Sequence, residues 1–146
     1  MAREDAPPSV FVDANVLFSG VRATAGPPAE ILALHAAGLI TIVISRQIVE
    51  ELVRNLRKKE PAALPVAIAF FDGAEPILAS DPDEGAVDRL AGHVNANDAP
   101  IVATALTAEI TYFVTGDRQL ADEVKAIAPS FAVLSPREFI DEFTHD

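Results

Sequence analysis

The sequence predicts an α/β fold in which a parallel sheet carries helices on both faces. Short runs rich in β-branched and aromatic residues alternate along the chain with longer segments of helical periodicity. The apolar runs carry no polar face, as expected of strands that are covered on both sides. No two-residue hairpin turn joins neighbouring runs, so the strands are expected to pair in parallel through crossover helices.

Length and composition favour one cytoplasmic domain. The chain has 146 residues, half of them hydrophobic, which is enough for a single core. Residues 1–8 are predicted to form a flexible leader, with the domain spanning 9–143. No apolar run is long enough to cross a membrane, no secretory leader is recognisable, and the absence of cysteine excludes disulfides and thiolate metal sites. We therefore expect a cytoplasmic location and no membrane partner.

The net charge limits the kinds of partner. The chain carries 22 acidic and 11 basic residues, which gives a formal charge of −11. Such a chain is not expected to bind nucleic acid through its bulk charge. Bound divalent cations and a local basic patch can reverse the sign of the potential near a site, so a nuclease is not excluded.

The first half of the chain is expected to begin with two strands and two helices. Residues 10–12 form a buried, β-prone run, and a Gly-Pro-Pro turn can start a helix over 29–37. A second buried strand is expected at 41–45. Ser45 is placed to cap a helix over about 46–58, which carries one apolar stripe.

The remaining elements continue the alternation of helices and strands. They are expected in the order helical segment 66–71, weak strand 76–79, helix 86–94, a helix opened by 95–100, strand 111–114, helix 119–128, strand 131–134 and a closing helix through 143. Pro76 favours a place at the sheet edge, because proline cannot donate to an interior ladder. The acids at 81–84 and the serine at position 135 are interpreted as caps of the helices that follow them.

Acidic side chains are expected to meet at one edge of this sheet. Asp13 follows the first strand, Asp117 follows the strand at 111–114, and Asp98 opens a helix. In open α/β sheets, ligands bind at the edge formed by the carboxyl ends of the strands. Asp13 and Asp98 also suit an ordinary capping role, and this alternative stays open.

Glu51 is preferred over Glu50 as the fourth carboxylate. Both residues flank the apolar stripe of their helix, so the helical wheel does not choose between them. Glu50 has Arg54 four residues later, the favourable arrangement for a solvated ion pair, whereas Glu51 has Asn55 there. Glu51 is therefore the freer carboxylate. Close carboxylates repel and raise one another's pKa, and a hard divalent cation such as Mg²⁺ or Mn²⁺ would relieve this conflict.

At these residues the chain resembles the PIN-domain family of metal-dependent ribonucleases, many of which are toxins of bacterial toxin–antitoxin pairs. The four family motifs are matched, in order, by 12–17 (Val-Asp-Ala-Asn-Val-Leu), 50–52 (Glu-Glu-Leu), 97–99 (Asn-Asp-Ala) with 103–105 (Ala-Thr-Ala), and 114–120 (Val-Thr-Gly-Asp-Arg-Gln-Leu). Residues 134–139 also resemble the ending of one toxin-like branch. Each motif is weak alone, but all four in this order are specific.

The resemblance implies a single three-layer PIN-like domain with about five parallel strands and a site for Mg²⁺ or Mn²⁺. The implied metal ligands and catalytic residues are Asp13, Glu51, Asp98 and Asp117. The implied supporting residues are Asn15 and Thr115. Candidate phosphate contacts are Arg46, Arg54 and Arg118. Asn95 stands where many family members carry a further acid, so a second metal ion would be held more weakly.

The implied activity is hydrolysis of RNA phosphodiester bonds that leaves a 3′-hydroxyl. Besides the RNA substrate, the candidate partners are a cognate antitoxin protein and a second copy of the chain in a homodimer. The alternative is a catalytically silent PIN scaffold that binds protein or RNA, which the intact acids disfavour. A phosphatase of related topology would need an acid at position 15, and a receiver-like domain would need a lysine within 134–136; the chain has neither.

Overall fold

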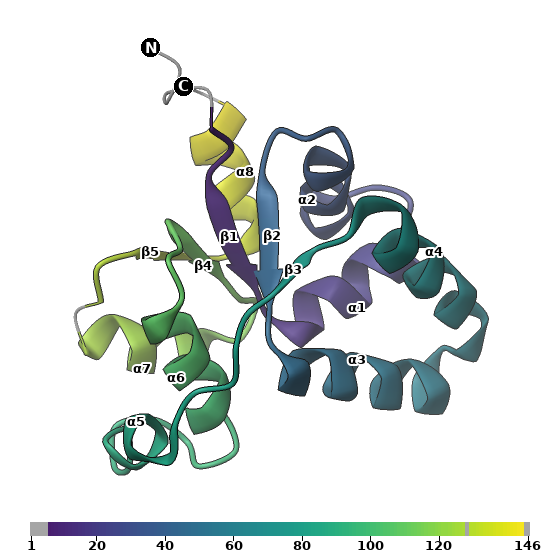
Figure 1. Ribbon diagram of the computed structural model, residues 1–146. Helices are drawn as coiled ribbons and strands as arrows, with labels where there is room; N and C mark the ends of the chain where they lie inside the picture. The colour runs from purple at the N-terminus through teal and green to yellow at the C-terminus, as the bar shows by residue number, and fades with distance from the viewer. Residues whose placement is uncertain (1–5, 128, 145–146) are drawn as a thin grey trace.

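Five parallel strands form the centre of the protein (Figure 1). The computed structural model describes residues 6–127 and 129–144. The strands are arranged in the order β3-β2-β1-β4-β5, and every neighbouring pair is parallel. The predicted α/β class and the five-stranded parallel sheet are therefore confirmed, and the weak third strand is at the edge, as expected.

Helices and strands alternate along most of the chain. Their order is β1 (Ser9–Val12), α1 (Ala14–Arg22), α2 (Pro27–Ala36), β2 (Thr41–Ile44), α3 (Arg46–Lys59), the 3-10 helix η2 (Pro61–Ala63), α4 (Leu64–Ala74), β3 (Ile77–Leu78), α5 (Glu84–Asp88), α6 (Ala99–Thr107), β4 (Tyr112–Val114), α7 (Arg118–Ala126), β5 (Ala132–Leu134) and α8 (Pro136–Thr144).

Strand β1 lies at the middle of the sheet and of the core. Val10, Phe11 and Val12 are fully buried. Phe11 is in register with Val43 of β2 and with Phe113 of β4, and the rings of Phe11 and Phe113 stack with centroids 5.4 Å apart. The chain first extends the sheet to one side of β1 and later to the other. The carboxyl ends of β1 and β4 therefore form a topological switch point, where open α/β sheets bind ligands.

The helices divide between two sides of the view in Figure 1. Helices α1, α2, α3 and α4 lie to the right of the strands, whereas α5, α6 and α7 lie to the lower left. The carboxyl ends of β1 and β2 point to the lower centre, where α1 and α3 begin. This arrangement brings the starts of several helices to the switch point.

The predicted helix caps are present. The Oγ atom of Ser45 accepts a hydrogen bond from the backbone N–H of Ile48 at 3.1 Å. Asp83 Oδ1 accepts from the N–H of Ala86 at 2.7 Å, and Ser135 caps α8 in the same way. These side chains satisfy backbone donors that have no partner inside the helix.

Helix α1 was not predicted, because its composition is poor for helix formation. Its sequence contains asparagine, serine, glycine and two valines, all weak helix formers. Its buried residues are Ala14, Val16, Leu17, Gly20 and Val21. The helix contacts α2 and α3, so tertiary packing rather than intrinsic propensity stabilises it.

Several boundaries differ from the expected ones. Helix α5 ends at Asp88 instead of residue 94, and the chain continues in turns through Gly92, whose φ of +83° favours glycine. Helix α7 ends at Ala126; the expected end at residue 128 lies outside the described residues.

The predicted leader is described only in part. Residues 1–5 lie outside the described residues. The carbonyl of Pro8 accepts a hydrogen bond from the N–H of Thr41 at 2.9 Å, so the end of the leader continues the pairing of β1 with β2. Across the described ranges, the helices are all too short or too polar to cross a bilayer.

Gly20 marks the closest approach of α1 to α2, and its substitution tests this packing. A Cβ atom at Gly20 would lie 2.7 Å from Leu32 Cδ1 and 3.0 Å from the carbonyl oxygen of Pro28. We expect Gly20→Ala to lower the free energy of unfolding by about 1–3 kcal/mol, because overpacking outweighs a helix-propensity gain of roughly 0.5–1 kcal/mol. Gly73→Ala on α4 is the matched control, since a Cβ there meets nothing within 4 Å. Urea denaturation should show the control to be neutral or stabilised; equal stabilisation of both variants would contradict the close packing.

Candidate active site

Asp13 occupies the end of β1 and the start of α1. Its backbone N–H donates to the carbonyl of Val114 at 3.0 Å, which places it beside the end of β4. Its Oδ1 accepts from the N–H of Ala14 at 2.8 Å, and its Oδ2 accepts from Thr115 Oγ1 at 2.8 Å and from Asn15 Nδ2 at 3.2 Å. Asp13 is only 6% exposed. Three donors therefore hold a nearly buried carboxylate in one orientation.

The end of β4 supplies the second acid and the residue that links it to the first. Thr115 is buried, and its Oγ1 accepts from the N–H of Asp117 at 3.1 Å while donating to Asp13. Asp117 Oδ1 caps α7 by accepting from the N–H of Leu120 at 3.1 Å. The N–H of Gly116 donates to Asn15 Oδ1 at 3.4 Å. Asn15 and Thr115 thus connect the two loops that carry Asp13 and Asp117.

Asp98 is placed at the start of α6 without serving as its cap. It stands at the N-cap position, but its side chain makes no capping hydrogen bond. The first turn of α6 contains Pro100, which has no N–H to satisfy. Asp13 and Asp117 do cap their helices. The capping role that was left open for Asp13 and Asp98 is therefore present in Asp13 and absent in Asp98.

The four predicted carboxylates share one electrostatic environment. Burial is the main cause that raises the pKa of Asp13, and the charge of Asp117 raises it further, against the hydrogen bonds that lower it. Burial also raises the pKa of Glu51, with Asp13 and Asp98 adding to the effect. The pKa of Asp98 is raised by burial and then by Asp13 and Asp117. Side chains from α3, from the loops after β1 and β4 and from the start of α6 therefore lie close enough for their charges to affect one another.

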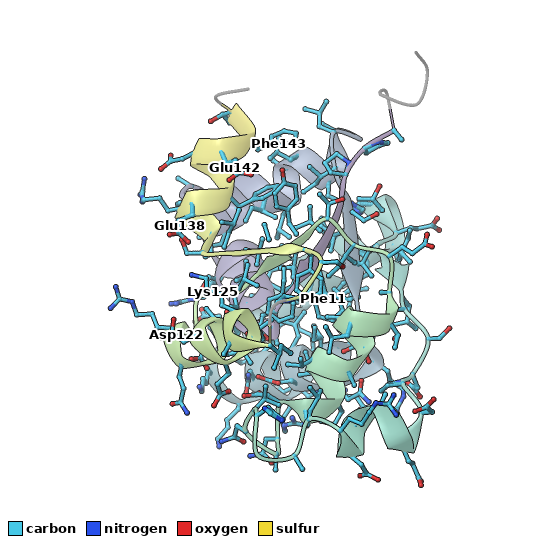
Figure 2. The ribbon with its side chains drawn as sticks, turned by 90° about the vertical axis from the view of Figure 1, so that its left-hand side faces the viewer. Phe11, Asp122, Lys125, Glu138, Glu142 and Phe143 are labelled. Atoms are coloured by element: carbon cyan, nitrogen blue, oxygen red, sulfur yellow. The ribbon has the colours of Figure 1, made fainter. Side chains whose placement is uncertain are left out.

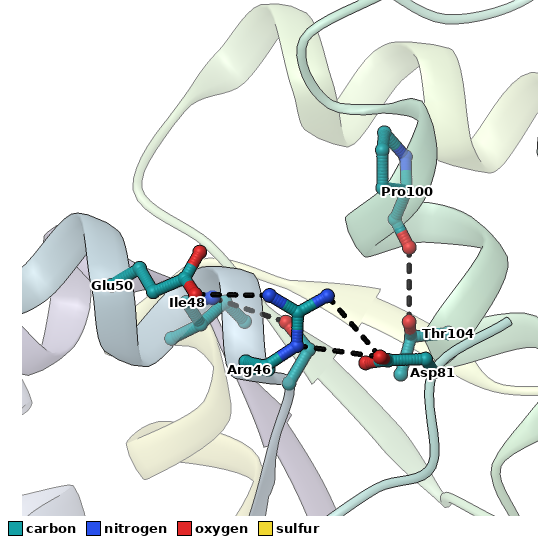
Figure 3. Close-up of polar contacts among 7 residues, drawn as sticks. Arg46, Ile48, Glu50, Asp81, Pro100 and Thr104 are labelled. Carbon is teal, nitrogen blue, oxygen red and sulfur yellow. Dashed lines mark hydrogen bonds and ion pairs between the residues drawn. The ribbon is translucent and has the colours of Figure 1, made fainter.

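Glu50 lies outside this group, as expected, but its predicted partner was wrong. Its side chain is 55% exposed and pairs with Arg46 Nη1 at 2.9 Å instead of with Arg54 (Figure 3). Asp81, in the loop after β3, holds the other side of the Arg46 guanidinium at 3.2–3.3 Å. Arg46 stands four residues before Glu50 on the same helix, so this pair is local, and the contact with Asp81 adds a second carboxylate from a distant segment.

The three predicted phosphate contacts differ in how far their charge is already compensated. Arg46 is shared between two carboxylates. Arg54 is exposed, and its charge lowers the pKa of Glu51, which places it beside the carboxylate group. Arg118 is exposed at the first position of α7, directly after Asp117. The geometry thus favours Arg54 and Arg118 over Arg46 as contacts for an anion.

Glu123 is a nearby acid that the sequence analysis did not select. It lies on α7, and its charge raises the pKa of Asp98. Its Oε1 accepts from the N–H of Asn95 at 3.4 Å, while Asn95 Oδ1 accepts from the N–H of Asn97 at 2.9 Å. A carboxylate six residues after Asp117 is a weak sequence signal, because acids are common on exposed helix faces.

The donor chemistry of the site fits a hard divalent cation. All the side chains offer oxygen, which Mg²⁺ and Mn²⁺ prefer, and the raised carboxylate pKa values are what a cation would relieve. Within residues 6–127 and 129–144, no three histidine, cysteine or acidic side chains stand close enough, as placed, to hold one ion together. Chelation by three of the carboxylates would therefore require their side chains to rotate inward.

Comparisons with solved structures show the same fold in other proteins. The crystal structure of VapBC2 from Rickettsia felis, bound to a DNA fragment from its promoter, matches with a TM-score of 0.65 and 19% identity over 87% of this chain and 98% of that chain. PAE2754 from Pyrobaculum aerophilum matches with a TM-score of 0.68 and 16% identity over 95% and 91%. FitAcB from Neisseria gonorrhoeae matches with a TM-score of 0.53 and 17% identity over 88% and 98%.

The sequence itself identifies the family. A comparison with curated proteins found no match. The profile of the PIN domain, however, matches residues 9–119, about three quarters of the chain, and this range includes Asp13, Glu51, Asp98 and Asp117. The chain therefore belongs to the PIN-domain family.

Proposed function

We propose that this protein is a divalent-metal-dependent ribonuclease, the toxin of a toxin–antitoxin pair. The observation that carries the proposal is the group of four carboxylates at the switch point: burial and then neighbouring acids raise the pKa of Asp13, Glu51 and Asp98, although Asp98 has no capping role. Acids that crowd together and have raised pKa values are typical of a site built for catalysis or metal binding. Membership of the PIN-domain family supports nuclease chemistry for this group.

Asp13, Asp98 and Asp117 would hold the Mg²⁺ or Mn²⁺ ion, and Glu51 would bind a second ion or orient the attacking water. Such an ion, when bound, supplies positive charge that lowers the pKa of a water molecule and stabilises charge on the phosphate. Asn15 and Thr115 orient Asp13, so they would act as supporting residues.

The protein's own groups suit the remaining steps of hydrolysis. Glu51, which lies near Asp13 and Asp98, would orient the attacking water and accept its proton. The water oxygen bonds to phosphorus and the bond to O3′ breaks, so one product carries a 5′-phosphate and the other a 3′-hydroxyl. Arg54 and Arg118 would contact neighbouring phosphates of the RNA.

An antitoxin partner is proposed from the family and from the fold. Two of the similar solved structures are the VapBC2 and FitAcB assemblies, although identities below 20% support the fold alone. A small protein with a DNA-binding segment, encoded by the neighbouring reading frame, would be the expected partner. We also propose that the chain can form a homodimer and that it is located in the cytoplasm.

Metal dependence separates this enzyme from a silent scaffold. Cleavage of single-stranded RNA by the purified protein should stop in EDTA and return with Mg²⁺ or Mn²⁺. Asp98→Asn should abolish cleavage, whereas Asp83→Asn, which alters a capping acid outside the site, should not. The measurement is gel analysis of a labelled RNA. Full cleavage by the chelated protein would overturn the mechanism, and no cleavage with either metal would favour the silent scaffold.

Thr115 should matter through its hydroxyl. Thr115→Val removes the hydrogen bonds to Asp13 and Asp117 and should reduce metal affinity or cleavage by about 10–100-fold, the usual effect of losing a group that orients a ligand. Thr115→Ser keeps the hydroxyl and should restore most of the loss. Metal titration followed by calorimetry, together with cleavage rates, measures both variants. Equal behaviour of the valine and serine variants would mean that the hydroxyl has no orienting role.

Removal of the Asp98 charge should stabilise the metal-free protein in a pH-dependent way. A carboxyl whose pKa is raised by folding binds its proton more tightly in the folded state, so stability falls as the pH rises from about 4 through the folded pKa. In EDTA at pH 7 we expect Asp98→Asn to melt above wild type, and the difference to disappear near pH 4. Metal at a hundredfold excess over its Kd should stabilise wild type by about 2.7 kcal/mol, and the variant by less. A variant that melts below wild type at pH 7 in EDTA would assign Asp98 a structural role.

A further inference from the structure

A cavity of about 640 Å³ opens between α7 and α8, at the carboxyl ends of β4 and β5. One end of this α7–α8 pocket is formed by Thr115 and Gly116, so it begins where the carboxylate site ends. Ala121, Val133 and Leu134 form an apolar wall, whereas most of the lining is polar or charged. Figure 2 shows Asp122 and Lys125 on α7 below Glu138 on α8. The pocket thus combines a small apolar wall with a charged rim.

The rim carries both acidic and basic side chains, and its two acids differ in whether they already accept a hydrogen bond from the protein. Glu138 is committed to its helix: its Oε1 accepts from the N–H of Ser135 at 2.8 Å, and this bond is the main cause that lowers its pKa, with Lys125 and Arg118 contributing. Ion pairs within the described ranges join Arg22 to Glu60 and Arg46 to Glu50 and Asp81, so none involves Asp122, Lys125 or Arg118. Among the described residues, the pocket therefore presents Asp122 beside two cations, Lys125 and Arg118, that act on Glu138 through their charge without forming an ion pair.

This combination excludes several classes of ligand. A bare phosphate would face Asp122 and Glu138 as well as the cations, and a purely apolar ligand would leave the charged rim without partners. A planar base can instead lie on the apolar wall and bond to both signs of charge through its edge. Of the four RNA bases, guanine alone places two adjacent donors, N1–H and N2–H, beside an acceptor, O6. Two carboxylate oxygens match the donors, and an ammonium or guanidinium group matches O6 and N7.

We propose that the α7–α8 pocket binds a guanine base of the RNA substrate, next to the phosphate that is cleaved. Asp122 accepts from N1–H and N2–H of the base, Lys125 donates to O6, and Arg118 lies between the pocket and the carboxylate site. Since Thr115 lines the pocket and also holds Asp13, a base in the pocket would place its own phosphate near the four acids. This inference rests on the proposed function and adds a sequence preference to it.

Binding of nucleotides without metal tests the pocket independently of cleavage. In EDTA, isothermal titration should show 5′-GMP to bind wild type at least about tenfold more tightly than 5′-AMP or 5′-IMP, which lacks only the N2 amino group. Asp122→Asn should remove the preference for GMP over IMP. Lys125→Met should weaken the binding of GMP by a similar factor. Asp72→Asn, an exposed acid on α4, is the matched control and should keep wild-type binding. Equal affinity for the three nucleotides, or an unchanged preference in Asp122→Asn, would overturn the inference.

Cleavage-site mapping with metal then distinguishes failure of the pocket from failure of the proposed function. Wild type should cut preferentially beside guanine, and Asp122→Asn should cut with less preference for that base. Cleavage that ignores guanine would overturn the pocket assignment while leaving the ribonuclease in place. Selective GMP binding by a protein that cuts no RNA would support the pocket and overturn the proposed function.

Discussion

The burial of the Asp13 carboxylate is the constraint on which the rest of the site depends. A charge at 6% exposure loses most of its hydration, and the three hydrogen bonds from Ala14, Asn15 and Thr115 replace part of it. Those donors come from the start of α1 and from the loop after β4. The same interactions that make the buried acid tolerable therefore fix the two loops at the switch point of the sheet.

The other carboxylates add charge repulsion to the free-energy cost of burying Asp13. Glu51 on α3 and Asp98 at the start of α6 both lie near Asp13. Burial raises the pKa of each, and the neighbouring acids raise it further. The charge of Arg54 lowers the pKa of Glu51 and so opposes these effects. Like charges that lie close together in a partly buried site reduce the stability of the folded state. A fold selected only for stability would therefore not bring these acids together. The large buried core around β1 offsets this local cost.

Much of the fold was predictable because strand burial and helix capping leave local signals. The five strands, their parallel pairing and the caps at Ser45 and Ser135 agree with the sequence pattern. Helix α1 was missed because its stability comes from contacts with α2 and α3, which composition does not encode. The ion pair expected between Glu50 and Arg54 was wrong, because Glu50 pairs with Arg46, four residues before it on the same helix.

The sequence by itself determined which acids stand at the ends of strands and the starts of helices, because the carboxyl ends of parallel strands share one edge. It could not determine whether an acid there is a cap, since a capping aspartate and a free one occupy the same position along the chain. Only the tertiary structure showed that Asp117 caps α7 while Asp98 caps nothing, and that Glu123 and the α7–α8 pocket adjoin the same site. These features depend on contacts between segments far apart in the chain, and local propensity carries no information about them.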